Sequence, residues 1–179
     1  LLSIVIPSHN KTELLFEAVE SILAESSFDE RCEVCVSDNS LSKTTSSRVT
    51  SKYSGDDRII YRRSLDSPSM DENIARAVSM ARGKYVWIFG DDDLIVPGAL
   101  GSILANIENG DCGIYILNSQ SFTSGRIIES HRHFYKESKE YGPSENDDFM
   151  AEMGGYLTYL GCILVEKKVW DKNFDLAFM

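Results

Sequence analysis

Apolar residues along this sequence occur in two kinds of segment. Short apolar runs rich in β-branched and aromatic residues are typical of buried strands, and apolar residues at every third or fourth position are typical of amphipathic helices. The two kinds alternate, which predicts an α/β domain with a mostly parallel sheet covered by helices on both faces. Strands are expected at residues 3–7, 33–37, 58–62, 84–90 and 113–117. Helices are expected over 11–25, from an N-cap at Asp71 to Gly83, and from Pro97 to Gly110.

The pattern changes after residue 118. Residues 121–135 alternate like an exposed hairpin, residues 144–153 are typical of an acidic helix, and residues 156–165 are typical of a long strand. The sequence has no internal repeat, low-complexity segment or linker. We therefore expect one domain over 1–179, in which residues 119–179 form a small lobe built onto the sheet of residues 1–118.

Charge and composition narrow the classes of partner. The chain has 179 residues, with 28 Asp and Glu against 18 Lys and Arg, so its formal net charge is −10. Its 42% of apolar residues suffice for a sizeable core, which excludes a disordered chain. An acidic chain is poorly suited to nucleic acid or an anionic lipid surface as its main partner. If the ligand carries phosphate, positive charge must come from outside the chain.

The number and spacing of the cysteines, and the lack of a long apolar run, indicate in which cellular compartment the protein is expected. Four cysteines are too few and too scattered for a disulfide framework. Cys32 and Cys35 lie in an apolar run without a second pair that would complete a zinc site, so we expect buried strand cysteines. No run approaches the roughly 18 apolar residues of a membrane span. We expect a cytoplasmic protein, and association with the inner face of the membrane through segments outside this sequence stays open.

Three consecutive aspartates, at positions 91–93, are the strongest chemical signal. Adjacent carboxylates repel one another and raise each other's pKa unless a cation lies among them. Side chains two apart on an extended backbone point the same way, so Asp91 and Asp93 are expected to share one ligand face. Carboxylate oxygens suit Mg²⁺ or Mn²⁺ bound to a diphosphate. The alternative is an acidic helix N-terminus ahead of Pro97.

Asp38 is the second candidate because it ends a strand of the predicted sheet. Ligands of such sheets bind outside the carboxyl ends of the strands, where the loops after the first, second and fourth strands converge. A carboxylate there is suited to accept hydrogen bonds from a base or a ribose, and the alternative is that Asp38 forms an Asx-turn or a helix cap. The converging residues are Pro7, Ser8, His9 and Asn10, then Asp38 and Asn39, and then residues 91–93.

Three motifs in order connect the chain with a known family. They are Ser3-Ile-Val-Ile-Pro-Ser-His-Asn10, Val34-Cys-Val-Ser-Asp-Asn-Ser40, and the long stretch from Asn73 through Trp-Ile-Phe-Gly-Asp-Asp-Asp to Leu100. Together they resemble the family 2 glycosyltransferases of the GT-A fold over about residues 2–118. The likeness is greatest to bacterial enzymes that extend O-antigen or other surface polysaccharides, including abequosyltransferase-like members.

The resemblance implies a site. It places the nucleotide's base and ribose at the loop after Pro7 and at Asp38, and the metal on the diphosphate at the aspartates, as in a DXD motif. Many relatives read Asp-x-Asp-Asp before the Leu-x-x-Pro segment, and the first of those carboxylates falls on Gly90 here. Asp93 is the leading metal ligand, with Asp91 as the second. The implied nucleotide-sugar-binding residues are Pro7, Ser8, His9, Asn10, Asp38, Asn73, Asp91 and Asp92.

The resemblance also implies a reaction. A metal-dependent inverting enzyme would transfer a sugar from a nucleotide diphosphate, UDP first and CDP or dTDP as alternatives, to a glycan or lipid-linked glycan acceptor. Residues 1–118 would bind the donor and 119–179 would lie on the acceptor side. The general base is expected beyond Met179, with Asp175, Asp147 and Asp148 as alternatives within the chain.

Two other functions stay open. A non-catalytic module would keep the nucleotide-sugar site and lack the base. A sugar nucleotidyltransferase needs a glycine-rich basic loop after the first strand, which residues 7–10 do not provide.

Overall fold

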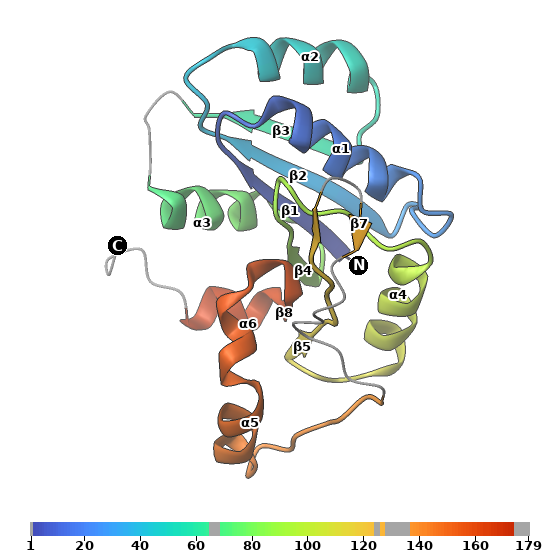
Figure 1. The fold of residues 1–179 in the computed structure, drawn as a ribbon, viewed down its shortest axis with the longest axis vertical. Helices are drawn as coiled ribbons and strands as arrows, with labels where there is room; N and C mark the ends of the chain where they lie inside the picture. The colour runs from blue at the N-terminus through green and yellow to red at the C-terminus, as the bar shows by residue number, and fades with distance from the viewer. Residues whose placement is uncertain (1, 65–68, 124–125, 128–136, 174–179) are drawn as a thin grey trace.

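A six-stranded mixed sheet forms the centre of the computed structural model, which describes residues 2–64, 69–123, 126–127 and 137–173 (Figure 1). The strand order is β3-β2-β1-β4-β8-β5. The first four of these strands are parallel, and β8 is antiparallel to both of its neighbours. This sheet confirms the predicted fold class. The strands are β1 (Leu2–Ser8), β2 (Cys32–Asp38), β3 (Ile59–Arg63), β4 (Tyr85–Ile88), β5 (Ile114–Ile116) and β8 (Ile163–Glu166).

Helices cover both faces of the sheet. Helices α1 (Thr12–Leu23) and α4 (Ala99–Asn109) pack on one face, and α2 (Thr44–Tyr53) joins them through Tyr53. Helix α3 (Met70–Met80) covers the other face together with α6 (Lys167–Asn173). The remaining elements are α5 (Asn146–Met153), two 3-10 helices at Gly154–Thr158 and Leu160–Cys162, and the paired short strands β6 (Phe122–Thr123) and β7 (Arg126–Ile127).

Strand β1 shows why its sequence forms a central strand. Leu2, Ile4 and Ile6 point into the core shared with α1 and α4, and Val5 points into the core under α3. All four side chains are fully buried. A strand buried on both faces needs a continuous apolar run, which is the pattern that predicted it. Cys32 and Cys35 are buried thiols of β2, as expected.

Two local expectations are corrected, and one helix was not predicted. The N-cap of α3 is Ser69 rather than Asp71, and Ser69 and Glu72 form a capping box. Helix α4 begins at Ala99, after Gly98 with its left-handed φ of 83°, and not at Pro97. Helix α2 was not predicted because only Thr45 and Val49 of its residues are buried, so its sequence carries almost no apolar periodicity.

The expected long strand at residues 156–165 is mostly wrong. Two 3-10 helices occupy Gly154–Thr158 and Leu160–Cys162, and the strand is confined to Ile163–Glu166. A strand extends only as far as it finds hydrogen-bonding neighbours, and β8 lies between the short strands β4 and β5. The predicted exposed hairpin is present as β6 and β7, and residues 124–125 and 128–135 of it lie outside the described residues.

Within the described ranges, no helix combines the length and the apolar character that crossing a membrane requires.

Candidate functional site

Apart from Asn73 on α3, the predicted nucleotide-binding and metal-binding residues lie at the carboxyl ends of β1, β2 and β4. From β1 the chain proceeds to β2 and β3 on one side, then returns to β4 on the other side of β1. Adjacent strands whose connections run in opposite directions leave a crevice at their carboxyl ends, where ligands of open α/β sheets bind. The loop after β1 and the aspartates after β4 therefore face the same edge.

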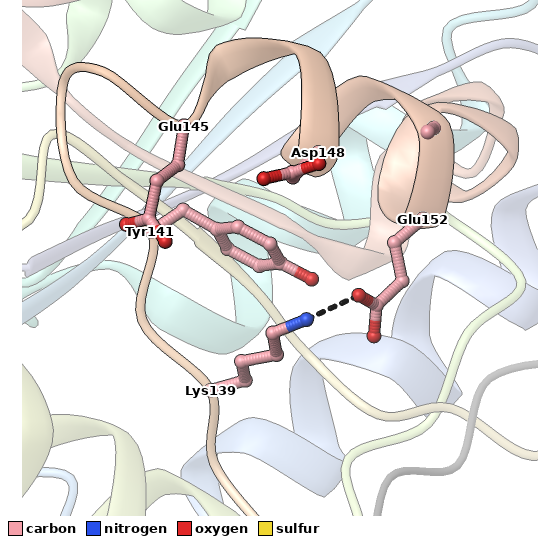
Figure 2. Close-up of a pocket in the computed structure, with 6 residues that line it drawn as sticks. Lys139, Tyr141, Glu145, Asp148 and Glu152 are labelled. Atoms are coloured by element: carbon pink, nitrogen blue, oxygen red, sulfur yellow. Dashed lines mark hydrogen bonds and ion pairs between the residues drawn. The ribbon is translucent and has the colours of Figure 1, made fainter.

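A separate hollow lies beside α5. Its cavity volume is about 350 Å³, and it is lined by Lys139, Tyr141, Glu145, Asp148, Ala151 and Glu152 (Figure 2). Lys139 forms an ion pair with Glu152 and lies 4.6 Å from the centre of the Tyr141 ring. Of the predicted residues only Asp148, an alternative for the general base, lines this hollow. Asp147 is exposed on the same helix, and Asp175 lies outside the described residues.

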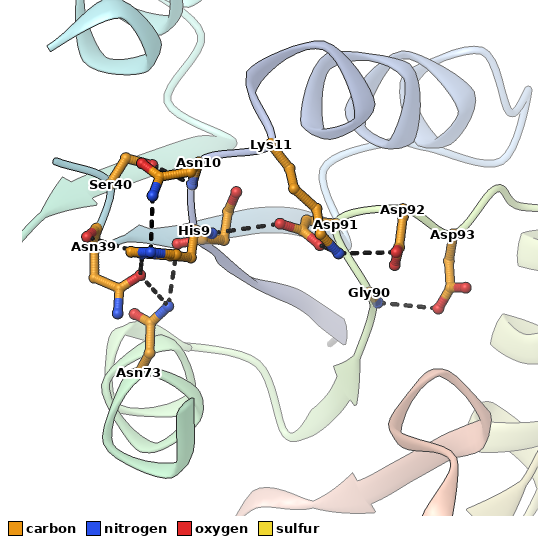
Figure 3. A network of polar contacts seen from close by, with 11 residues as sticks. His9, Asn10, Lys11, Asn39, Ser40, Asn73, Gly90, Asp91, Asp92 and Asp93 are labelled. Atoms are coloured by element: carbon orange, nitrogen blue, oxygen red, sulfur yellow. Dashed lines mark hydrogen bonds and ion pairs between the residues drawn. The ribbon is translucent and has the colours of Figure 1, made fainter. Parts of the chain in front are cut away.

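His9 joins the loops after β1, β2 and β4 (Figure 3). Its backbone N–H donates to Asp91 Oδ2 at 3.4 Å. Its ring Nδ1 lies 2.9 Å from Asn39 Oδ1, and its Nε2 lies 2.8 Å from Asn10 Nδ2. An amide oxygen only accepts and an amide nitrogen only donates, so these contacts assign the proton to Nδ1 and leave Nε2 as an acceptor.

Asn73, on α3, forms hydrogen bonds with the ends of both β1 and β2. Its Nδ2 donates to the carbonyl oxygen of Ser8 at 3.3 Å and to Asn39 Oδ1 at 3.5 Å, and its Oδ1 accepts from Ser37 Oγ at 2.7 Å. Asn73 is buried on α3. These hydrogen bonds position the two loops. The nucleotide-binding role of Asn73 stays a prediction.

The turn after β1 is shaped by Asn10. Its φ of 56° is left-handed, a conformation that asparagine tolerates better than most residues. The turn is tied to the loop after β2, because Asn10 N–H donates to Ser40 Oγ at 2.8 Å. Pro7 and Ser8 end β1, and the buried Ser8 hydroxyl has no hydrogen-bond partner in the part of the chain that the structure describes.

Asp38 is fully buried, and both of its carboxylate oxygens accept hydrogen bonds. Ser40 N–H donates to Oδ1 at 2.8 Å, and the Tyr61 hydroxyl donates to Oδ2. Burial raises the pKa of Tyr61, and its hydrogen bond to Asp38 raises it further. The contact with Ser40 is the Asx-turn that the sequence left open. The nucleotide-binding role of Asp38 stays a prediction.

Lys11 is a residue of this site that the sequence reasoning missed. Its ammonium Nζ lies 3.0 Å from Asp91 Oδ1 and 2.8 Å from Asp92 Oδ2. The hydrogen bond with Asp92 raises the pKa of Lys11, burial opposes this, and Asp91 adds to the rise. The sequence did contain a signal for a cationic group near the site, because Lys11 is the first Lys or Arg after β1. It was assigned to the start of the following helix and not to the loop.

The Asp93 side chain lies beside that of Asp92 and is hydrogen-bonded to Gly90 (Figure 3). Its Oδ2 accepts from Gly90 N–H at 3.2 Å. A Cβ atom would lie 2.4 Å from this oxygen at Gly161 and 2.6 Å from it at Gly90, so a side chain at either position would require the carboxylate to move. Burial raises the pKa of Asp93, the Gly90 hydrogen bond lowers it, and the charges of Asp92 and Asp91 raise it.

The aspartates therefore pair differently from the expectation. Asp91 and Asp92 converge on one cation, whereas the sequence reasoning expected Asp91 and Asp93 to share a face. The two-residue rule holds on an extended backbone, but here Asp93 N–H donates back to the Gly90 carbonyl at 3.3 Å, which marks a turn. The assignment of Asp93 as metal ligand stays a prediction.

The donor set fits a divalent cation of the magnesium type. Over the described ranges, no three or more His, Cys, Asp or Glu side chains gather as a closed metal cage. Mg²⁺ in proteins keeps several waters and uses only one or two carboxylates together with substrate phosphates. Asp91 and Asp92, which meet at one ammonium, supply such a pair.

Comparison with known proteins identifies relatives. The profile described as "Glycosyl transferase family 2" matches residues 3–172. The chain is 29% identical to the abequosyltransferase RfbV of Salmonella typhimurium over 100% of its own length and 57% of the relative. It is 27% identical to the GalNAc(5)-diNAcBac-PP-undecaprenol beta-1,3-glucosyltransferase of Campylobacter jejuni, over 97% of this chain and 55% of that one. The chain thus spans little more than half the length of these relatives.

Solved structures share the fold. S. aureus TarS matches 96% of this chain and 48% of its own chain, with a TM-score of 0.75 and 18% identity. In its complex with UDP-GlcNAc the TM-score is 0.72, with 17% identity over 96% of this chain and 47% of that one. A mannosyltransferase of Pyrobaculum calidifontis, in complex with GDP-Man and Mn²⁺, matches 65% of this chain and 34% of its own, with a TM-score of 0.57 and 18% identity.

Proposed function

The chain belongs to glycosyl transferase family 2, and from this premise we propose that it forms the donor-binding part of a metal-dependent inverting glycosyltransferase. The donor is a nucleotide diphosphate sugar, with UDP first and CDP or dTDP as alternatives. The acceptor is a glycan or lipid-linked glycan of a surface polysaccharide. The observation that carries the proposal is the convergence of Asp91 and Asp92 on one cationic point at the carboxyl ends of β1 and β4.

The relatives support the donor and the acceptor classes. TarS binds UDP-GlcNAc, and the Pyrobaculum mannosyltransferase binds GDP-Man with Mn²⁺. The Campylobacter relative is named for a lipid-linked acceptor. In this chain, the loops held together by His9 and Asn73 would bind the base and ribose beside Asp38. The diphosphate would then lie toward Asp91 and Asp92.

In this reaction the acceptor hydroxyl attacks the anomeric carbon from the face opposite the leaving diphosphate, so the configuration inverts. A carboxylate base removes the proton of that hydroxyl. A divalent cation held by Asp91 and Asp92 would compensate the negative charge of the departing diphosphate. The contribution of this chain is to fix Asp91 and Asp92 beside the diphosphate, with Asp91 held in place by the backbone N–H of His9.

A thermal-shift experiment with UDP, CDP and dTDP, each with and without Mn²⁺, tests the proposal. A nucleotide at about 100 times its Kd stabilises by roughly 2.7 kcal/mol, or about 5–10 °C for a chain of this size. We expect the full shift only with metal and nucleotide together. If no nucleotide stabilises the protein even with Mn²⁺, the donor-site assignment is wrong.

Single variants locate the metal. Asp92 is 53% exposed, so Asp92→Asn is expected to fold normally and to lose the metal-dependent part of the shift. Asp57→Asn is the matched control, because Asp57 is exposed and precedes β3 at the opposite edge of the sheet. Asp93→Ala tests the prediction from the sequence that Asp93 is the leading ligand. If Asp92→Asn keeps the full metal response, Asp92 is not a ligand.

A further inference from the structure

The ammonium of Lys11 lies at the point where the carboxylates of Asp91 and Asp92 meet. Each contact is an ion pair, at 3.0 Å and 2.8 Å. The Asp91 side chain is 9% exposed, and a nearly buried carboxylate without a counter-charge is costly. Lys11 thus supplies, within the chain, positive charge that the net charge of −10 suggested had to come from outside.

The same point cannot hold Lys11 and a divalent cation together. A cation ligated by Asp91 and Asp92 would lie next to the ammonium, and like charges in contact repel strongly where water is partly excluded. The Lys11 side chain is 43% exposed and has a flexible four-carbon stem, so rotation about its bonds can carry the ammonium away from the carboxylates. Metal binding to these oxygens therefore requires Lys11 to leave them.

An anionic donor offers Lys11 a new position. Lys11 is the residue directly before α1, so its flexible stem starts where the unpaired N–H groups of that helix already favour negative charge. A lysine ammonium binds phosphate as a point charge. A diphosphate bound at this edge by the metal would lie within the same group of charges.

We propose that Lys11 is an internal counter-cation that exchanges the Asp91–Asp92 pair for the diphosphate of the donor when metal and nucleotide bind. This inference rests on the proposed function. In the donor-free protein, Lys11 neutralises the two carboxylates and opposes binding of metal alone. In the loaded protein, Lys11 contacts the diphosphate and strengthens its binding.

The exchange predicts effects of opposite sign for one substitution. Lys11→Met keeps the length of the side chain and removes its charge. Binding of Mn²⁺ alone is expected to strengthen about 3- to 10-fold, because the competing ion pairs are lost. Binding of nucleotide with Mn²⁺ is expected to weaken roughly 10-fold or more, because a charge-assisted contact to phosphate is lost.

Electron paramagnetic resonance of free Mn²⁺ measures the first affinity, and calorimetry in saturating Mn²⁺ measures the second for UDP, CDP and dTDP. The proteins are wild type, Lys11→Met, Lys11→Gln as a second neutral variant, and Lys11→Arg, which keeps the charge and is expected to resemble wild type. Lys52→Met is the matched control, because it removes a lysine whose ion pair is with Glu20 on α1.

The outcomes separate the two proposals. Opposite shifts in both neutral variants, absent in Lys52→Met, support the exchange. If wild type binds nucleotide with Mn²⁺ but Lys11→Met behaves like Lys52→Met, or shifts both affinities in the same direction, the role of Lys11 is overturned and the proposed function stands. If wild type binds no nucleotide even with Mn²⁺, the proposed function is overturned, and the role of Lys11 with it.

Discussion

Replacement of Glu25 tests how the segment after the aspartates is held. Glu25 follows α1, and its side chain accepts hydrogen bonds from the N-terminus of α4. Gly98 N–H lies 2.9 Å from Oε1 and 3.0 Å from Oε2, and Leu100 N–H lies 3.1 Å from Oε2. The first N–H groups of a helix have no partner within it, and Gly98 has no side chain that caps. Glu25 serves as a cap from a distant part of the chain.

The expected loss of stability on replacing Glu25 follows from these hydrogen bonds. Glu25 is 9% exposed, so its removal leaves two N–H donors beside a space that water enters poorly. Loss of hydrogen bonds to a charged group costs about 1.5–3 kcal/mol, and the favourable charge at the helix N-terminus adds to this. We expect Glu25→Ala to lower the free energy of unfolding by about 3 kcal/mol, or roughly 6–12 °C in Tm. Glu25→Gln keeps one acceptor and is expected to cost about 1 kcal/mol.

Urea unfolding followed by circular dichroism measures both variants. Glu17→Ala is the control, because Glu17 is an exposed glutamate on α1 and its loss is expected to change stability by less than about 0.5 kcal/mol. The predicted order of destabilisation is Glu25→Ala, then Glu25→Gln, then Glu17→Ala. A Glu25→Ala protein as stable as the control would refute the capping role.

Two further predictions concern the carboxylates of Glu33 and Asp93. Burial raises the pKa of Glu33, but hydrogen bonds from Ser3 and Arg82 lower it below its ordinary value overall. A carboxylate whose pKa is lowered by folding stabilises the protein at pH values above its unfolded pKa of about 4.5, and this stabilisation is lost as the pH falls. The difference in unfolding free energy between wild type and Glu33→Gln, measured by urea titration, should therefore shrink from pH 6 to pH 3. A difference that stays constant over this range contradicts the prediction. Gly161→Ala should lower the free energy of unfolding by about 1–3 kcal/mol, because the added methyl group clashes with the Asp93 carboxylate. Asp93→Ala in the same protein should relieve this clash. Strictly additive losses in a double-mutant cycle would contradict a contact between Gly161 and Asp93.

Local pattern determined much of this protein. Strands β1 and β4 are buried on both faces, so their residues had to be apolar in continuous runs, and such runs are visible without a structure. The alternation of strands and helices then predicted the fold class. Order along a parallel sheet also predicted that the loops after β1, β2 and β4 meet at one edge.

Elements with weak local signals depended on their neighbours. Helix α2 has only two buried residues, so its position comes from packing beside α1 and not from its own periodicity. Strand β8 is short because it lies between the short strands β4 and β5, and a strand extends only where its edges find hydrogen-bonding partners. Its insertion there brings Gly161 against Asp93, a contact between residues distant in sequence.

The sequence by itself determined which residues carry charge at the site, and only the tertiary structure decided how those charges pair. Three aspartates in a row favour a cation among them, because adjacent carboxylates repel one another. The turn after Gly90 decided that Asp91 and Asp92 converge on Lys11 and that Asp93 is hydrogen-bonded to Gly90. The approach of β1 to β4 decided that the cation between them is Lys11, since a pairing across 80 residues depends on distance in space and leaves no local pattern.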